Sequence, residues 1–405
     1  MTAPWPRSFA PLRHGAFALM MGGVLLTNLG HSVQGVGAAW HLTASGAPAD
    51  VVALVQTALN LPILLLALPA GAWADMYDKR RIIIGAHLTM LAGCALLIAL
   101  TGLGMASAAP VIVLTGAIAC AAACFGPAMG ASIRSAVPAG ELAVAVALNI
   151  LIFNAARAIG PALGGGIVSA GGAQTAFVGA AVFYATALAI YTKWRGASPP
   201  PEARLRLAAM ITQGLRAAAL SRELRTILSR AFLFTLAGAA AWALMPLVSA
   251  QMLGRGASTY GLLLGALGLG AVIGAASATW LRQRLSAEAI TGGAGLVYGA
   301  ACLGVAAAPG LVPMLALLVV AGAGWVQALS GFSVSSQLWA PRHAVGRIVA
   351  MASALTFGGL ALGSWLWGHV AQDFGVATAL AASGAAMLLL PLLGRVLPMP
   401  AHEQD

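Results

Sequence analysis

The stretch LALPAGAWADMYDKRR, residues 66–81, marks the point where a long apolar segment ends in a cluster of charges. The run before the cluster, residues 51–74, has no charged side chain and about the 20 residues that a helix needs to cross the hydrocarbon core of a bilayer. The charged side chains that follow are Asp75, Asp78, Lys79, Arg80 and Arg81. We interpret this stretch as the end of a transmembrane helix followed by a turn in water.

The composition indicates that such helices make up most of the chain. Of its 405 residues, 60% are hydrophobic and 8% are charged, and the mean hydropathy is +0.92. Soluble proteins carry about 25% charged residues, so these values predict a membrane protein with many crossings. The 50 glycines suit close helix packing within lipid.

Apolar runs separated by short turns with Gly and Pro predict an all-α protein with twelve transmembrane helices. We expect these helices near residues 15–41, 51–74, 82–102, 110–131, 142–169, 173–193, 226–253, 257–281, 287–307, 311–338, 346–371 and 375–397. The chain then divides into an N-terminal six-helix half (residues 1–193), a basic linker (194–225) and a C-terminal six-helix half (226–405). The charge pattern of the linker favours a basic helix on the membrane surface.

Lys and Arg are distributed unevenly about these expected helices. With the N-terminus inside, 19 of the 21 basic residues fall on the cytoplasmic side, Arg255 falls outside and Arg157 lies within a helix. The positive-inside tendency therefore predicts that both termini are cytoplasmic. This asymmetry, together with contact with anionic membrane lipid, explains the net charge of +11, and no other feature supports a nucleic-acid partner.

The two halves are related by a constant offset of 203 residues. The offset pairs Gly71 with Gly274, Gly160 with Gly363, and Gly165 with Gly368. One offset that holds through a loop and several helices favours an ancestral duplication. Two halves related by an axis along the membrane normal, with a substrate site near the midplane between them, are typical of alternating-access transporters.

Polar side chains within the expected helices are candidates for a substrate site. Arg157 lies near the middle of its helix, where a cation is costly, so we expect it either to face a cavity or to be satisfied by Asn154 and a backbone carbonyl. The other polar residues could line the same cavity or form hydrogen bonds between helices. The candidate substrate-binding residues are Asn28, His31, Gln34, Gln56, Asn60, Asn154, Arg157, Trp242, Gln327 and Ser330.

Two segments resemble motifs of the major facilitator superfamily. Residues 71–81 have the spacing of its signature loop, although Met76 and Asp78 stand where Arg and Gly are usual. In the fifth helix, GPALGG (160–165) resembles a motif core of superfamily exporters that work by antiport, although Ala156 stands where another Gly is usual. The resemblance implies that Asp75 latches the outward-open state against the start of the eleventh helix. The implied conformational-switch residues are Gly71, Asp75, Lys79, Arg80, Gly160, Pro161, Gly164 and Gly165.

Three segments resemble, within the superfamily, the bacterial branch that includes the enterobactin exporter: residues 60–62 with 68–71, residues 153–161 and residues 357–364. The resemblance implies a proton-linked exporter of siderophores or amphipathic drugs in the bacterial inner membrane. Residue chemistry alone reaches only a secondary transporter of small molecules, which we expect to act as a monomer. A lysophospholipid flippase is an alternative, and a membrane enzyme is a less favoured one.

The acidic residues are informative by their positions. All ten map to loops, helix ends or tails, so the usual carboxylate for carrying a proton or binding a cationic drug is missing, and His31 and His87 are the remaining titratable candidates. Neither a phosphate-binding loop nor a hydrolase motif is present. We therefore expect no cofactor, no metal and no enzymatic activity, with an H⁺ gradient as the driving force.

Overall fold

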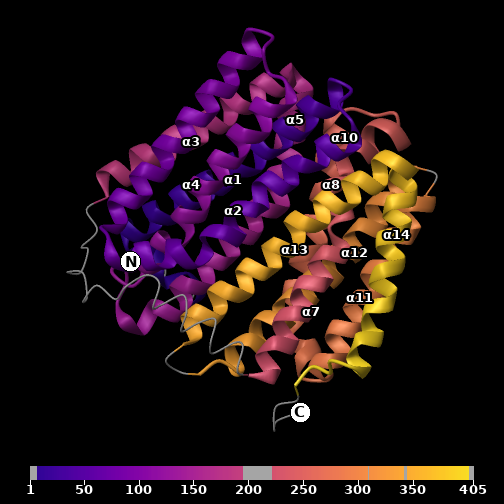
Figure 1. Ribbon diagram of the computed structural model, residues 1–405. Helices are drawn as coiled ribbons and strands as arrows, with labels where there is room; N and C mark the ends of the chain where they lie inside the picture. Colours follow the sequence, from indigo (N-terminus) through magenta and orange to yellow (C-terminus); the bar gives the residue numbers. More distant parts are fainter. Residues whose placement is uncertain (1–6, 195–220, 309, 342–343, 401–405) are drawn as a thin grey trace.

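The computed structural model describes residues 7–194, 221–308, 310–341 and 344–400, which form helices joined by short turns (Figure 1). The long helices of the first half are α1 (Gly15–Ala44), α2 (Ala49–Met76), α3 (Lys79–Gly102), α4 (Ala108–Ile133) and α5 (Leu142–Lys193). Short 3-10 helices, η1 (Arg7–Arg13) and η2 (Ala139–Glu141), precede α1 and α5. The basic helix predicted within the linker lies outside the described residues.

The helices of the second half are α7 (Arg222–Gly238), α8 (Ala240–Ala243), α9 (Met245–Leu247), α10 (Ala257–Arg282), α11 (Ala287–Ala307), α12 (Leu311–Leu338), α13 (Val345–Phe374) and α14 (Val376–Leu389). A π-helical turn, η3 (Val248–Met252), follows α9, and a 3-10 helix, η4 (Leu390–Arg395), follows α14. Figure 1 shows the first half in indigo to magenta beside the second half in pink to yellow. The fold consists of two helical bundles side by side.

The described residues contain ten helices that are long and apolar enough to span a bilayer. One of them, α5, is two helices in succession, because Gly171 and Gly172 interrupt it with non-helical backbone angles. Gly172 has a φ of 81°, a left-handed conformation that glycine adopts without steric cost. Together with α7–α9, these helices give twelve crossings, which confirms the predicted fold class.

The seventh crossing differs from its prediction. The sequence predicts one continuous helix over residues 226–253, whereas α7 ends at Gly238 and shorter pieces follow it. Pro246 has no N–H to donate and its ring crowds the preceding turn, which accounts for the break at Leu244 between α8 and α9, though not for the end of α7 at Gly238. The twelfth expected helix likewise changes to 3-10 geometry beside Pro391. The short helix α8, between Gly238 and Pro246, carries Trp242.

The two bundles meet along two helix pairs. We call the membrane side that holds Lys193 and Arg222, between which the linker runs, the linker side, and the opposite side the far side. Between α5 and α10, a Cβ added to Gly165 would lie 2.6 Å from the carbonyl oxygen of Ala257 and 2.8 Å from Cα of Gly261. Only glycine permits so close an approach of two backbones. Because α10 begins on the far side at Ala257, this contact lies toward the far side.

The second pair, α2 and α13, is joined by hydrogen bonds. The hydroxyl of Thr57 donates to the carbonyl of Ala361 at 2.9 Å, and the N–H of Ala49 donates to Oε1 of Gln372 at 2.7 Å. Ala49 is the first residue of α2 and lies on the far side. The halves are therefore held together at the far side by both helix pairs.

The glycine contacts follow the 203-residue repeat. Gly160 of α5 packs on α1, and its counterpart Gly363 of α13 packs on α7, so each contacts the first helix of its own half. Gly165 packs on α10, and its counterpart Gly368 packs on α2, so each contacts the opposite half. Equivalent positions thus make equivalent contacts, as a duplicated six-helix unit requires.

Candidate functional site

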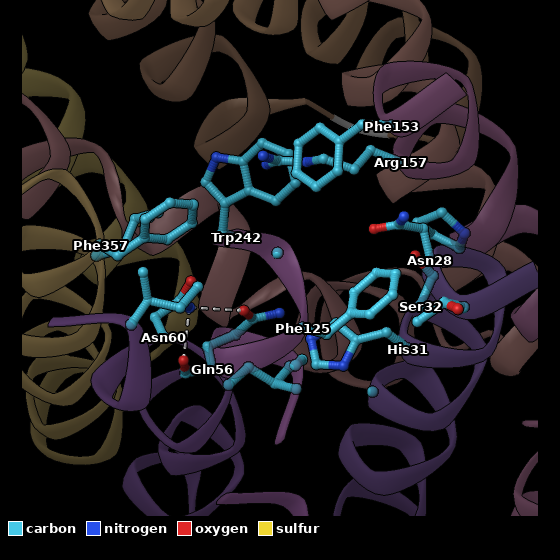
Figure 2. Close-up of a pocket in the computed structure, with 18 of the residues that line it drawn as sticks. Asn28, His31, Ser32, Gln56, Asn60, Phe125, Phe153, Arg157, Trp242 and Phe357 are labelled. Atoms are coloured by element: carbon cyan, nitrogen blue, oxygen red, sulfur yellow. Dashed lines mark hydrogen bonds between the residues drawn. The ribbon is translucent and has the colours of Figure 1, made fainter. Parts of the chain in front are cut away.

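A cavity of about 480 Å³ lies between the two bundles (Figure 2). Its lining comes from α1, α2, α4 and α5 of the first half and from α8, α10 and α13 of the second half. Sites for drug-sized ligands have volumes of about 300–1,000 Å³. The cavity therefore has room for a small organic molecule, and both halves shape it.

The first half supplies most of the polar groups of the lining. Asn28, His31 and Ser32 come from α1, and Gln56 and Asn60 come from α2. Nδ2 of Asn60 donates to the carbonyl of Gln56 at 2.6 Å, and Nδ2 of Asn28 donates to a carbonyl one turn earlier at 2.8 Å. Each amide is thus held against its own helix, and its carbonyl oxygen is left as an acceptor for a ligand.

The second half contributes an apolar, aromatic wall. Trp242, Tyr260 and Phe357 line the cavity together with two leucines. The buried Tyr260 ring stacks on Trp40, with 6.3 Å between ring centroids, so this part of the wall is firmly packed. The indole N–H of Trp242 is buried without a hydrogen-bond partner in the described part of the chain. A ligand that accepts a hydrogen bond could satisfy it.

Arg157 lies where the two walls meet. Its guanidinium carbon is 5.3 Å from the ring centroid of Trp242 and 5.7 Å from that of Phe153. It forms no ion pair and no hydrogen bond with any residue that the structure describes. The alternative partner expected from the sequence, Asn154, lies outside the cavity and donates instead to the carbonyl of Ile150 at 2.9 Å. Arg157 therefore faces the cavity.

The two candidate histidines have different environments. His31 lines the cavity, and its Nδ1 is buried without a partner among the described residues. His87 is fully buried behind the wall, where its Nδ1 lies 2.8 Å from the carbonyl of Ile83 and its Nε2 lies 2.9 Å from the hydroxyl of Thr27. Thr27 itself lines the cavity. His87 is thus separated from the cavity by a single hydrogen-bonded side chain.

Four predicted substrate residues lie outside the cavity lining: Gln34, Asn154, Gln327 and Ser330. Nε2 of the buried Gln34 donates to the hydroxyl of Thr115 at 2.9 Å and links α1 to α4. Nε2 of Gln327 donates to a carbonyl of α10 at 2.7 Å, and the hydroxyl of Ser330 accepts from Arg282 at 3.3 Å. The structure places these four residues outside the cavity, because their side chains bond to neighbouring helices or to their own helix.

Some cavity residues were not among the predicted substrate-binding residues. Asn149 and Phe153 line the cavity on the same helix as Arg157. These three residues are spaced by four, so they share one face of α5, and this spacing was the available signal. Phe125 and Tyr260 also line the cavity, but an aromatic residue in an apolar helix looks the same whether it faces lipid, protein or a cavity.

The GPALGG segment of α5 is the point where that helix touches both halves. A Cβ added to Gly164 would lie 3.2 Å from Cα of Val33 in α1, and one added to Gly165 would lie 2.8 Å from Cα of Gly261 in α10. Pro161, between these contacts and Arg157, lines the cavity. The segment therefore combines close helix contact with a proline that can bend the helix.

The loop between α2 and α3 is organised by a residue that departs from the superfamily pattern. A side-chain oxygen of Asp78 accepts hydrogen bonds from the N–H groups of Arg80 at 2.8 Å and Arg81 at 3.2 Å, and so caps α3, which begins at Lys79. The Arg80 side chain donates to two carbonyls at the end of α5, at 2.9 and 2.6 Å. The side chain of Asp75 lies outside the described part of the structure, so its role as a latch stays a prediction.

Comparison with known sequences identifies relatives along the whole chain. The sequence profile of a family described as transmembrane secretion effectors matches residues 6–405. The multidrug efflux pump Tap of Mycolicibacterium fortuitum is 27% identical over 404 residues, which cover 95% of this chain and 96% of Tap. Both similarities extend through the two halves and the linker.

Several solved structures share the fold. A POT family transporter in complex with 5-aminolevulinic acid has a TM-score of 0.77 at 10% identity, covering 94% of this chain and 95% of its own. The nucleoside transporter NupG has a TM-score of 0.77 at 11% identity, covering 94% and 99%. A bacterial homologue of the human lysosomal transporter Spinster, in an inward-facing conformation, has a TM-score of 0.71 at 14% identity, covering 98% and 96%. At these identities the likeness concerns the fold alone.

Proposed function

The chain belongs to the transmembrane secretion effector family of the major facilitator superfamily, and we propose that it exports amphipathic small molecules, such as drugs or siderophores, by secondary active transport. Its relatives are transporters, so the protein is a membrane transporter and not an enzyme. The similarity to a multidrug efflux pump supports the outward direction. The cavity between the halves is the observation that carries the proposal.

The position of the cavity supports an alternating-access mechanism. It lies between the two bundles, and the contacts of α5 with α10 and of α2 with α13 hold them together at the far side. Rocking of one half against the other would open the far side and close the linker side around the same cavity. We infer that the structure represents the state in which the far side is closed.

We further propose that the linker side is the cytoplasm and that the membrane is the bacterial inner membrane. Most Lys and Arg residues belong to the termini, the linker and the turns of this side, as the positive-inside tendency requires of a cytoplasmic face. The far-side closure then separates the cavity from the exterior. In this orientation substrate would load from the cytoplasm, as an exporter requires.

For the coupling ion we propose H⁺, carried by His87. Nδ1 of His87 donates to the carbonyl of Ile83, so Nε2 is the nitrogen that can gain or lose a proton. With a proton, Nε2 donates to Thr27, whose hydroxyl can then donate to the carbonyl of Gly23 at 2.8 Å; without one, Nε2 accepts from the same hydroxyl. The Thr27 hydroxyl therefore reverses its direction with the charge of His87. Because Thr27 lines the cavity, this reversal connects protonation with the substrate site.

Export can be tested in everted membrane vesicles, whose interior corresponds to the cell exterior. An acidic interior should drive uptake of an amphipathic dye by the wild-type protein, and absence of gradient-driven uptake for a panel of neutral, anionic and cationic dyes would contradict export by H⁺ exchange. We expect His87→Gln, which keeps hydrogen-bonding groups and cannot titrate, to abolish the dependence on the gradient. The matched control is His41→Gln, since His41 is partly buried outside the cavity. Gradient-driven uptake by His87→Gln at the wild-type rate would rule out His87 as the carrier and leave export standing.

A further inference from the structure

Two residues that line the cavity carry hydrogen-bond donors that the described residues do not satisfy. They are the guanidinium of Arg157 and the indole N–H of Trp242, and Figure 2 shows the two side chains beside each other at one end of the cavity. We propose that Arg157 and Trp242 form a subsite for the anionic group of an amphipathic organic acid, such as an aromatic carboxylate. This inference rests on the proposed function in taking the cavity as the substrate site.

The first step is the charge of Arg157. A guanidinium keeps its proton in proteins, so the side chain is a permanent cation with five N–H donors. Its contacts with the described residues are to the ring faces of Phe153 and Trp242. Ring faces attract a cation but leave the donors in the plane of the guanidinium without acceptors. A bound carboxylate would supply two oxygen acceptors in the geometry that this plane matches.

The second step is that Trp242, the neighbour of Arg157, also carries a group that can only donate a hydrogen bond. The indole N–H can only donate, and it belongs to the same Trp242 ring that the guanidinium of Arg157 covers at 5.3 Å. Two adjacent groups that only donate favour a ligand group that only accepts, as an ionised carboxylate does. The unpartnered Nδ1 of His31 can donate or accept, according to its tautomer, and so does not oppose an anion.

The third step is the absence of a counter-charge. No Asp or Glu is among the lining residues that the structure describes. A cationic ligand would meet the charge of Arg157 with no carboxylate to balance it, and a cation near a cation is repelled. Tyr260, Leu264 and Phe357 offer an apolar surface for the body of the ligand. The lining as a whole thus suits an amphipathic acid better than the neutral or cationic molecule of the same shape.

Three pyrene compounds of nearly equal size test this inference: pyrenebutyric acid, its amide and pyrenebutylamine. Binding to purified protein is measured by energy transfer from tryptophan to pyrene. We expect the wild-type protein to bind the acid most tightly and the amine least tightly. Arg157→Gln should weaken binding of the acid about tenfold or more and that of the amide less than about twofold, because charged hydrogen bonds are lost only with the acid. Arg157→Lys, which keeps the charge and loses the planar donors, should be intermediate.

Two further variants separate the subsite from general effects. Trp242→Phe keeps an aromatic ring and removes the N–H, so it should weaken binding of the acid more than binding of the amide. Both affinities are measured by displacement of a second ligand, because this variant also changes the tryptophan signal. Arg255→Gln removes one positive charge from an exposed position outside the cavity and should change neither. Thermal unfolding of each variant establishes that it is folded, and the preference of the wild-type protein among the three compounds needs no variant at all.

Several results would overturn the inference. One is equal binding of acid, amide and amine by the wild-type protein, and another is an equal loss for all three in Arg157→Gln. Binding of lysophosphatidylglycerol without binding of the pyrene acid would overturn the assignment to soluble organic acids. Because these titrations use no ion gradient, they are independent of transport. Gradient-driven uptake of the neutral amide would leave the proposed export standing even if the preference for acids were absent.

Discussion

The two halves of the repeat build opposite walls of one cavity with different chemistry. The first half contributes Arg157 and several amides, and the second half contributes aromatic and aliphatic side chains. At the 203-residue offset, Leu360 of the cavity wall is the counterpart of Arg157, and Phe357 is the counterpart of Asn154. The helix arrangement is shared, whereas the side chains differ. One wall can therefore hydrogen-bond the polar end of a ligand while the other buries its apolar body.

The two halves also differ in the link between their first and third helices. In the first half Thr27 is hydrogen-bonded to the buried His87. Its counterpart at the 203-residue offset, Arg230, forms an ion pair with Glu288, which also accepts from the N–H of Met399 at 2.7 Å. A neutral link can change its protonation state, whereas an ion pair that also holds the C-terminal segment is a fixed anchor. We expect the first half to couple proton movement to transport and the second half to stabilise the fold.

The anchor gives the largest expected effect. Arg230→Ala should lower the free energy of unfolding by about 2 kcal/mol, because it leaves Glu288 without its cation; the 37% exposure of Glu288 keeps the loss below that of a fully buried pair. Unfolding by SDS measures the change. The control is Arg13→Ala, which breaks an ion pair with Glu141 in which Arg13 is 57% exposed, and no measurable change is expected there. Equal effects of the two variants would contradict the contrast between anchored and exposed pairs.

The seam between the halves gives an effect of similar size. A Cβ at Gly165 would lie 2.6 Å from the carbonyl oxygen of Ala257, so Gly165→Ala should push α5 from α10 and cost about 1–3 kcal/mol, as overpacking does. The transport rate and the free energy of unfolding measured in SDS should both decrease. Gly166→Ala is the matched control, because its Cβ would meet nothing within 4 Å. If the two variants behaved alike, the far-side contact would not depend on the close approach of these backbones.

The apolar wall should contribute more affinity than the amides. Trp242→Ala removes a large ring surface from the cavity and should weaken binding of the neutral pyrenebutyramide roughly tenfold. Measurement is by displacement of a second ligand, because the tryptophan signal also changes in this variant. Affinity unchanged by Trp242→Ala would show that the second-half wall is not in contact with the ligand body.

The amide wall should give the smallest effect. Nδ2 of Asn60 is held by the carbonyl of Gln56 at 2.6 Å, so a ligand can use only the remaining oxygen. Asn60→Ala should therefore weaken binding of pyrenebutyramide less than about threefold. This loss corresponds to the net free energy of at most one weak hydrogen bond. The same displacement titration measures it. A loss of affinity larger than that caused by Trp242→Ala would show that the amide wall contributes more to binding than the apolar wall.

The sequence by itself determined the twelve crossings, because a bilayer imposes the same local requirement on each segment. About 20 apolar residues are needed for each crossing, and every backbone hydrogen bond must be satisfied within the helix. The break near Gly171 and the position of Arg157 within a helix were therefore predictable. The interruption at Pro246 was not, since the apolar run continues through it and hydropathy does not register a change of backbone geometry.

Only the tertiary structure decided which polar side chains form the site. Asn28 and Gln34 lie on the same helix, yet Asn28 faces the cavity and Gln34 faces Thr115 of α4. When all faces of a helix are apolar, its sequence does not show which face meets water. The neighbouring helices therefore decide whether a polar side chain faces a cavity or a hydrogen-bond partner. Arg157 and Trp242 belong to different halves and meet only when the bundles pack. Such a contact depends on the arrangement of whole bundles, and no local pattern of residues encodes it.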